Sequence, residues 1–203
     1  MKSLSEIDTV SKRASRAIGF SWGISEEVGK NIRMLEIFGL PGLKNLNDYY
    51  RSKKNEKFEN LKIISQKNKF NDIKLCPIIT GVSFLDQIKR LEILGEVIFE
   101  KIAYPILFLP FISRASEIIG KRILLKFDDK EFLLNLNINI YSNFFKNDIL
   151  KLAENISIKF MENSDSFLES EWNELYRLSE NTFVEENESL KKSGAGAGLT
   201  DND

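Results

Sequence analysis

FSWGISEEVG (residues 20–29), which continues to GLPG (residues 39–42), is the stretch from which the rest of the chain can be worked out. Within it, apolar side chains recur at spacings of four, four and three, at Ile24, Val28, Ile32 and Leu35. This spacing is typical of one face of an α-helix. Ser21 or Ser25 can cap the helix start, while Gly39 and Pro41 can end it. The sequence therefore predicts a helix with a buried face and defined ends.

Another face of this helix carries a column of larger side chains at the same spacing, namely Trp22, Glu26, Lys30 and Arg33. One interpretation is structural, with Glu26 and Lys30 as a surface pair worth about 0.2–0.5 kcal/mol. The other is functional: Arg33 and Lys30 bind a carboxylate or phosphate, Glu26 acts as acid or base, and Trp22 forms an apolar wall. The glycines at 23 and 29 allow close approach of either a ligand or another helix.

The composition is that of an ordinary folded protein, with 203 residues, 42% hydrophobic and 29% charged. A net charge of −1 argues against a general nucleic-acid binder. One cysteine cannot form an intramolecular disulfide, which fits a reducing compartment. Residues 1–6 do not resemble a signal peptide, and the most apolar stretch, residues 102–112, is too short to cross a bilayer. We therefore expect a cytoplasmic protein with no membrane partner.

The chain contains no histidine, which excludes Ser-His-Asp and Cys-His arrangements and histidine-based metal sites. Acid–base chemistry would have to come from Asp, Glu, Lys, Tyr or Cys76. A metal would be a hard divalent cation such as Mg²⁺, bound by oxygen atoms. Cys76 has two interpretations: a small buried hydrophobic residue, or a nucleophile with a lowered pKa.

The remaining patterns predict an α+β fold, with an N-terminal helical layer followed by a mostly antiparallel sheet with short helices. Further helices are expected at residues 4–17, 43–50, 112–119 and 147–155, and loosely at 81–94. Strands are expected at residues 58–66, 73–79, 104–111, 122–128, 131–137 and 156–160, with a hairpin between the fourth and fifth. We expect a single domain, with the helical layer at residues 1–52, the sheet-containing core at 58–160, and an acidic helix and tail at 165–203.

The segment from Glu162 to Glu188 is strongly acidic, with Arg177 as its single basic residue. Four of its residues share one helical face, namely Trp172, Leu175, Tyr176 and Ser179. This pattern predicts a packed helix with an acidic outer side.

Residues 193–203, SGAGAGLTDND, are rich in glycine and allow three interpretations. The first is a flexible tail. In the second, the backbone around Gly194, Gly196, Gly198 and Thr200 binds an anionic ligand through its N–H groups. In the third, Asp201 and Asp203 supply oxygen ligands to a divalent cation. The glycine spacing alone is weak evidence for a dinucleotide-binding motif, which needs a strand before it and a helix after it.

Short motifs are spread over nearly the whole chain: SWG at 21–23, EE at 26–27, Gly29, Arg33, GLPG at 39–42, CP at 76–77, LPF at 109–111 and GAGAGLTDND at 194–203. Together they resemble a bacterial protein family known only as a domain of unknown function. The most specific are the SWG…EE…G helix and the tail. The resemblance implies that the tail is a family feature, but it brings no reaction, cofactor or catalytic residue.

Our leading hypothesis is a small-molecule-binding protein, or an enzyme acting on an anionic metabolite, whose tail closes a pocket bordered by the helix of residues 24–35 and the Cys76-Pro77 turn. Arg33, Lys30 and Trp22 would bind the ligand, with Glu26 or Cys76 as catalytic candidates. The alternative is an accessory subunit or interaction protein that docks its tail on a partner. A homodimer with exchanged tails is a third hypothesis.

Overall fold

The N-terminal part of the chain folds into the three helices that the sequence predicts. In the computed structural model, which describes residues 2–69, 73–144 and 149–182, they are α1 (Leu4–Ala17), α2 (Trp22–Ile37) and α3 (Gly42–Ser52). Ser3 and Glu6 form a capping box on α1, and Ser21 caps α2. Gly39, directly after α2, has a φ of +69°, a left-handed conformation that favours glycine. The chain divides into two units, with the boundary between residues 163 and 164.

Helix α2 is one of the elements that join the helical layer to the rest of the first unit. Its buried side chains include Val28, Ile32 and Leu35, and it contacts α1, α3, α4 and α6. Gly29 faces α1, where an added Cβ would lie 2.8 Å from the carbonyl oxygen of Asp8. Since real Cβ atoms do not approach backbone oxygens so closely, this glycine is explained by the packing of a neighbouring helix.

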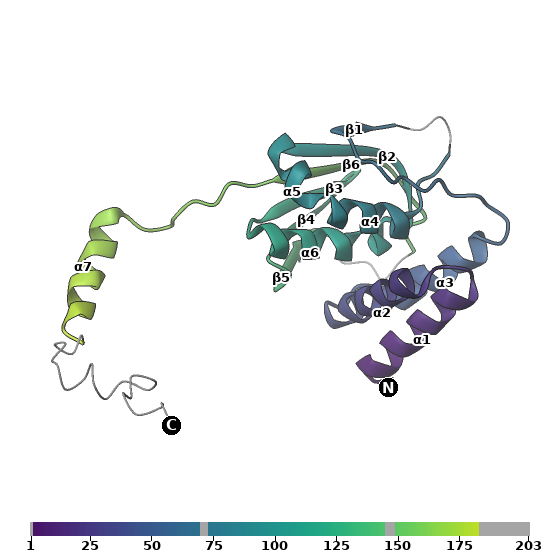
Figure 1. Cartoon of the computed structure of the whole chain (residues 1–203), viewed down its shortest axis with the longest axis horizontal. Coiled ribbons are helices and arrows are strands. Elements are labelled where there is room, and N and C mark those ends of the chain that lie inside the picture. Colours follow the sequence, from purple (N-terminus) through teal and green to yellow (C-terminus); the bar gives the residue numbers. More distant parts are fainter. Residues whose placement is uncertain (1, 70–72, 145–148, 183–203) are drawn as a thin grey trace, which may run out of the picture. The chain divides into compact units, whose positions relative to one another are not determined.

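The remainder of the first unit is built around a six-stranded sheet with strand order β1-β2-β6-β3-β4-β5 (Figure 1). The strands are β1 (Lys67–Asn68), β2 (Glu96–Ala103), β3 (Ile123–Phe127), β4 (Lys130–Asn135), β5 (Asn139–Ser142) and β6 (Leu152–Phe160). Neighbouring strands are antiparallel except β1 and β2, which are parallel. The predicted α+β fold with a mostly antiparallel sheet is therefore confirmed.

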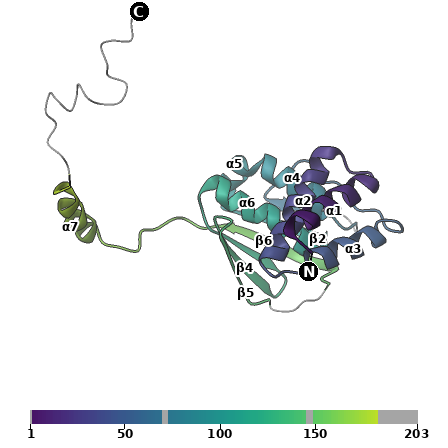
Figure 2. The same ribbon diagram turned by 90° about the horizontal axis from the view of Figure 1, so that it is seen from below.

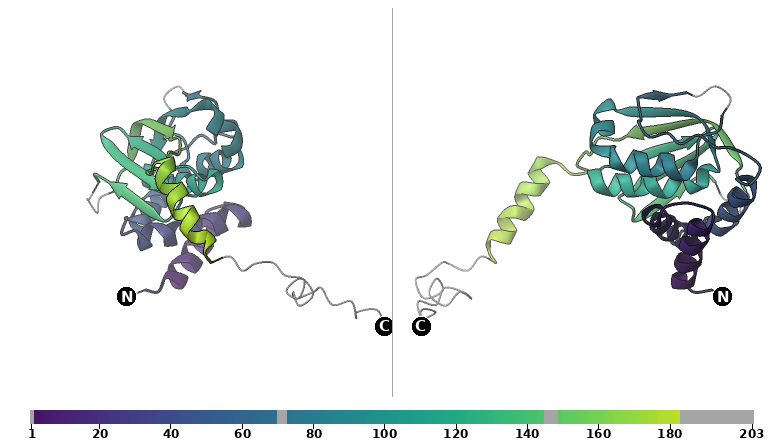
Figure 3. Two further views of the ribbon diagram at one scale, coloured as in Figure 1. Left: turned by 90° about the vertical axis from the view of Figure 1, so that its left-hand side faces the viewer. Right: turned by 45° about the vertical axis from the view of Figure 1, so that its right-hand side comes forward.

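One face of the sheet packs against helices (Figure 2). These are α4 (Pro77–Asp86) and α6 (Leu109–Ile119), accompanied by α5 (Ile88–Leu91) and the 3-10 helices η1 (Glu92–Leu94) and η2 (Pro105–Leu107). Alternate residues of β3, at Ile123, Leu125 and Phe127, are fully buried, as expected for a sheet with one covered face. Figure 3 shows the same helical cover from two further directions.

The prediction of strands at residues 58–66 and 73–79 is wrong. Residues 58–66 contain no strand: Glu59 forms an isolated bridge with Leu75, the carbonyl of Gln66 accepts a hydrogen bond from the N–H of Ile98, and the N–H of Ile64 donates to the side chain of Gln87. After Leu75 the chain enters α4, because Pro77 occupies its first turn and the Cys76 sulfur accepts a hydrogen bond from the N–H of Ile79. Proline is well suited to this position, since its missing N–H would have no partner there.

The strand predicted at 104–111 is also wrong. Both of its prolines, Pro105 and Pro110, lie in the first turn of a helix, η2 and α6 respectively. Tyr104 introduces the change of direction with a φ of +45°. The helix predicted at 112–119 is confirmed, but it begins earlier, at Leu109, and Gly120 ends it with a φ of +66°.

The C-terminal half of the sheet is only partly as expected. The hairpin is confirmed as β3 and β4, and the predicted strand at 156–160 is confirmed as the second half of β6. The helix predicted at 147–155 is wrong where the structure describes it, because residues 152–155 pair with β2 as part of β6. The sequence also failed to predict β2 and β5. β2 is recognised by its pairing with β6, which lies far away in the sequence, whereas β5 pairs with the strand directly before it, β4.

The second unit contains the predicted acidic helix as α7 (Glu169–Glu180). The carboxylate of Glu171 accepts a hydrogen bond from the N–H of Leu168 at 2.7 Å, which stabilises the helix start. None of the α7 residues is buried, so the prediction of a packed helix is not confirmed for the described residues. In the described part of the chain, no helix has the length and apolar character needed to cross a membrane.

Candidate functional site: a cationic pocket between α2 and α6

A pocket of about 620 Å³ lies where α2, α6 and the turn after β4 meet. Helix α2 and the residue after it contribute Lys30, Asn31, Arg33, Met34, Ile37 and Phe38, while α6 contributes Arg114 and the turn contributes Asn137 and Ile138. Three of these side chains are cationic, and none is acidic. The lining therefore combines basic side chains with apolar ones.

Glu27 holds two of the three cations. Its carboxylate accepts hydrogen bonds from Arg114 through Oε2 and from Lys30 through Oε1, the latter at 3.1 Å. Burial works to raise the pKa of Glu27, but these two hydrogen bonds outweigh it and hold the pKa below the usual value of a glutamate. Glu27 is therefore ionised at neutral pH and links α2 to α6 from beside the pocket.

Arg33 is the least restrained of the three cations. Its guanidinium lies 3.9 Å from the carboxylate of Asp8, too far for a hydrogen bond, and half of its side chain is exposed. A group arranged in this way can turn towards a bound molecule without breaking a strong native contact.

Two asparagines complete the polar part of the lining. Asn31 is 3% exposed, and neither its side-chain oxygen nor its nitrogen has a hydrogen-bond partner among the described residues. Asn137 is held by Ser113, which donates to its oxygen at 3.0 Å, and by Glu117, which accepts from its nitrogen at 3.1 Å. A buried amide without partners costs about 1–3 kcal/mol, so Asn31 is an unusual feature of this helix.

The structure brings together some of the predicted binding residues and separates others. Lys30 and Arg33 line the pocket, as the functional interpretation of the column requires. Glu26 does not: it is exposed, and within the described residues it forms no ion pair, so the expected Glu26–Lys30 pair is replaced by Glu27–Lys30. Trp22 also lies outside the lining, where its ring stacks on the guanidinium of Arg16 at 5.6 Å.

Sequence reasoning missed Arg114, Asn31 and Asn137. Arg114 lies on α6, which the sequence predicted only from residue 112 and could not place beside α2. Asn31 lies three residues after Val28 and four before Leu35, so a polar residue at a position of the apolar helix face was the available signal.

Cys76 lies in a different pocket, of about 380 Å³, whose described lining contains no residue of α2. The Cys76 sulfur is 3.0 Å from the hydroxyl oxygen of Tyr49, and the side chain is buried. Burial raises the pKa of the Cys76 thiol, which keeps it protonated at neutral pH. These observations favour the interpretation of Cys76 as a small buried residue over that of a nucleophile.

The other predicted ligands fall outside the described residues. These are Gly194, Gly196, Gly198 and Thr200 for an anion, and Asp201 and Asp203 for a cation. Among residues 2–69, 73–144 and 149–182, no group of three Cys, Asp or Glu side chains is arranged to hold a metal ion.

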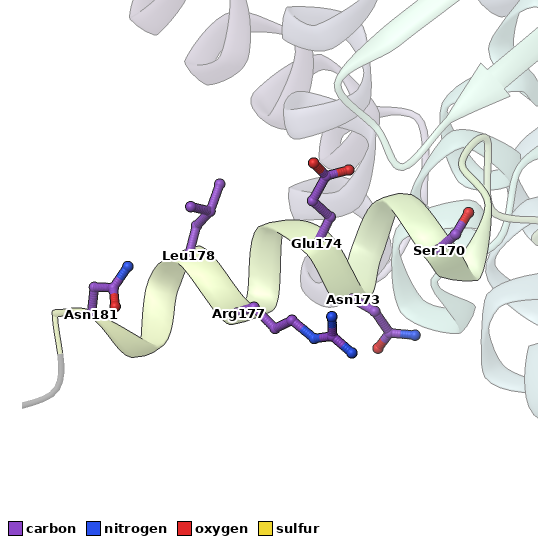
Figure 4. Close-up of a pocket in the computed structure, with 6 residues that line it drawn as sticks. All are labelled: Ser170, Asn173, Glu174, Arg177, Leu178 and Asn181. Atoms are coloured by element: carbon purple, nitrogen blue, oxygen red, sulfur yellow. The ribbon is translucent and has the colours of Figure 1, made fainter.

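A further hollow, of about 750 Å³, runs along α7 (Figure 4). Its described lining residues are Ser170, Asn173, Glu174, Arg177 and Leu178 of α7, and Asn181 directly after it. Figure 4 shows these side chains projecting from the helix. A hollow lined by a single helix gives a ligand contacts on one side only, and it carries no site assignment here.

The N-terminal part of the chain matches a known family. Residues 2–72 match the model of a family described as a protein of unknown function (DUF3726). This range contains α1, α2 and α3, including the SWG…EE…G helix, so the resemblance to a family of unknown function is confirmed over this part. The matched range ends before Cys76, Arg114 and the tail. Neither a curated protein nor a solved structure matches the chain.

Proposed function

We propose that this is a cytoplasmic protein that binds a small anionic metabolite in the pocket between α2 and α6. The observation that carries the proposal is the convergence of Lys30, Arg33 and Arg114 on a single pocket whose lining has no acidic side chain. The pocket volume of about 620 Å³ is in the range of small-molecule sites.

Arginine and lysine supply complementary contacts to an anion. A guanidinium presents its donors in a fixed planar fork that matches a carboxylate or phosphate, while an ammonium acts as a compact point charge. Because Glu27 uses only part of the donor capacity of Arg114 and Lys30, both retain N–H groups for a ligand.

The proposal is one of binding and includes no catalytic step. Glu26, the acid–base candidate of the sequence, lies outside the lining, and Cys76 belongs to the other pocket. The lining therefore offers recognition groups for a ligand without the pairing of acid and base that catalysis of proton transfer needs.

The experiment is a calorimetric titration of the full-length protein with inorganic phosphate. Replacing Arg33 by Gln should raise the dissociation constant about 10- to 150-fold, because one charge-assisted hydrogen bond contributes about 1.5–3 kcal/mol. Arg33 is half exposed, so the fold should tolerate the change. Arg13→Gln is the matched control, since Arg13 is an exposed arginine on α1, outside the pocket lining.

Equal weakening by Arg33→Gln and Arg13→Gln would show that phosphate responds only to overall charge. No heat of binding for the wild-type protein at millimolar phosphate would also contradict the proposal.

A second candidate function is favoured by α7, namely docking on another protein. Its apolar side chains are exposed, with Trp172 at 52% and Leu175 at 66%, and acidic residues flank them, at Glu169, Glu171, Glu174 and Glu180. An amphipathic helix of this kind fits an apolar groove whose rim carries lysine and arginine.

Co-purification with tagged full-length protein from the native cell tests the α7 candidate. We expect a stoichiometric partner with the wild-type chain and with Asn173→Glu, and loss of that partner with Leu175→Glu. Both variants add the same charge to the same helix, but only Leu175 belongs to the apolar face. Recovery of the same proteins with the wild-type chain and with both variants would exclude docking through this face. Gel filtration would show whether the partner is a second copy of the chain.

A further inference from the structure

We propose that the ligand of the α2–α6 pocket is a phosphate monoester, that is, a compact dianion attached to an apolar group. This inference rests on the proposed function and deepens it by naming the class of ligand. Three features of the pocket carry it: the closeness of two cations, the balance of charge, and the apolar side chains on the remaining wall.

The cationic groups of Lys30 and Arg114 are neighbours in space. Both contact the same carboxylate, that of Glu27, with Lys30 Nζ at 3.1 Å from one oxygen and Arg114 bonded to the other. Arg33 follows Lys30 by three residues, so the two side chains leave α2 on the same side. Cations gathered in this way suit an anion whose charges share one centre, such as a phosphate. A dicarboxylate would need cations placed further apart.

The described lining itself carries three positive charges and no negative one, which suits a dianion better than a monoanion. Three cations line the pocket, and Glu27 is hydrogen-bonded to two of them. Counting Glu27 with the three cations leaves a net charge of +2, and Arg33 can turn towards the ligand because it lies 3.9 Å from Asp8 without a hydrogen bond. A phosphate monoester carries close to two negative charges above its second pKa of about 6.

Apolar side chains form the rest of the wall and set the second requirement for the ligand. Met34, Ile37, Phe38 and Ile138 line the pocket, and two of them are exposed, Ile37 at 53% and Ile138 at 67%. Exposed isoleucines beside a cationic cluster gain free energy when an apolar group covers them, at about 25 cal/mol per Å². Free phosphate would leave this surface in water.

The inference is tested with three probes at pH 8, each titrated into the full-length protein. Phenyl phosphate carries both features, inorganic phosphate lacks the ring, and phenyl sulfate has the same shape as phenyl phosphate with a single negative charge. We expect phenyl phosphate to bind about tenfold more tightly than either of the other two, since each feature contributes on the order of 1.4 kcal/mol.

A pair of variants separates the contribution of the phenyl ring to binding from that of the phosphate charge. Ile37→Ser should weaken phenyl phosphate about fivefold and leave inorganic phosphate unchanged, because it removes apolar contact only. Ile118→Ser is the matched control, since Ile118 is also about half exposed but lies outside the pocket lining.

The outcomes distinguish this inference from the proposed function. Equal affinities for phenyl phosphate and phenyl sulfate would overturn the preference for a dianion, while the anion site itself would stand. Equal affinities for phenyl phosphate and inorganic phosphate, or equal effects of the two isoleucine variants, would overturn the apolar component. Absence of binding by all three probes would overturn the proposed function as well.

Discussion

Replacing Phe84 by Ala lowers the free energy of unfolding by about 3–5 kcal/mol, as for other large buried aromatic residues. Phe84 lies on α4 and is fully buried, with ring centroids of three other phenylalanines within 6.4 Å: Phe99 of β2, Phe108 before α6 and Phe160 of β6. The ring thus joins the helical cover to two central strands. Its removal leaves a cavity that the surrounding elements fill only partly.

Urea denaturation followed by circular dichroism measures the effect of Phe84→Ala. Phe84→Leu, which keeps most of the volume, should cost less than half as much. Phe167→Ala is the control for loss of a phenylalanine outside this core, since Phe167 is 44% exposed and should change stability by less than about 1 kcal/mol. A loss below about 1 kcal/mol for Phe84→Ala would contradict the packing described for α4.

Replacing Gly81 by Ala destabilises the protein by about 1–3 kcal/mol or more, although alanine favours helices. Gly81 lies inside α4, directly against the ring of Phe111, and an added Cβ would lie 2.7 Å from Cε2 of that ring. Phe111 is 1% exposed, so its ring has no free space into which it can move. The close approach of α4 to α6 therefore depends on this glycine.

A double mutant and a second glycine make this prediction specific. Combining Gly81→Ala with Phe111→Leu should cost less than the sum of the two single changes, because the smaller side chain relieves the overlap. Gly23→Ala is the control: Gly23 lies in α2 with no atom within 4 Å of an added Cβ, so the change should be neutral or stabilise by up to about 1 kcal/mol. Additive costs, measured by the same denaturation, would contradict the contact between Gly81 and Phe111.

The N-terminal helices could be predicted from sequence because local signals agreed. Capping serines, a regular apolar spacing and stop residues all specify α1 and α2 without reference to the rest of the chain. Around Pro77, Pro105 and Pro110 the same residue type has two meanings, the end of a strand or the first turn of a helix. Only the tertiary packing of α4 and α6 decides between them.

The candidate site was predictable only where it lies on one helix. Lys30 and Arg33 share a face with Glu26, but Glu27 is the residue that contacts Lys30, and one position along a helix turns the side chain by about 100°. Arg114 reaches the pocket from α6, and no local pattern relates it to α2. The sequence thus identified two of the cations but could not supply the third or the apolar wall.

The most direct test of the anion site is a titration of the ¹⁵N-labelled full-length protein with inorganic phosphate, followed by two-dimensional NMR. We predict that the largest shifts occur at Asn31, Arg33 and Arg114, which line the same pocket from two helices. Shifts confined to the exposed Arg13 and Arg16 on α1, or spread evenly over the chain, would contradict the assignment of the α2–α6 pocket as the binding site.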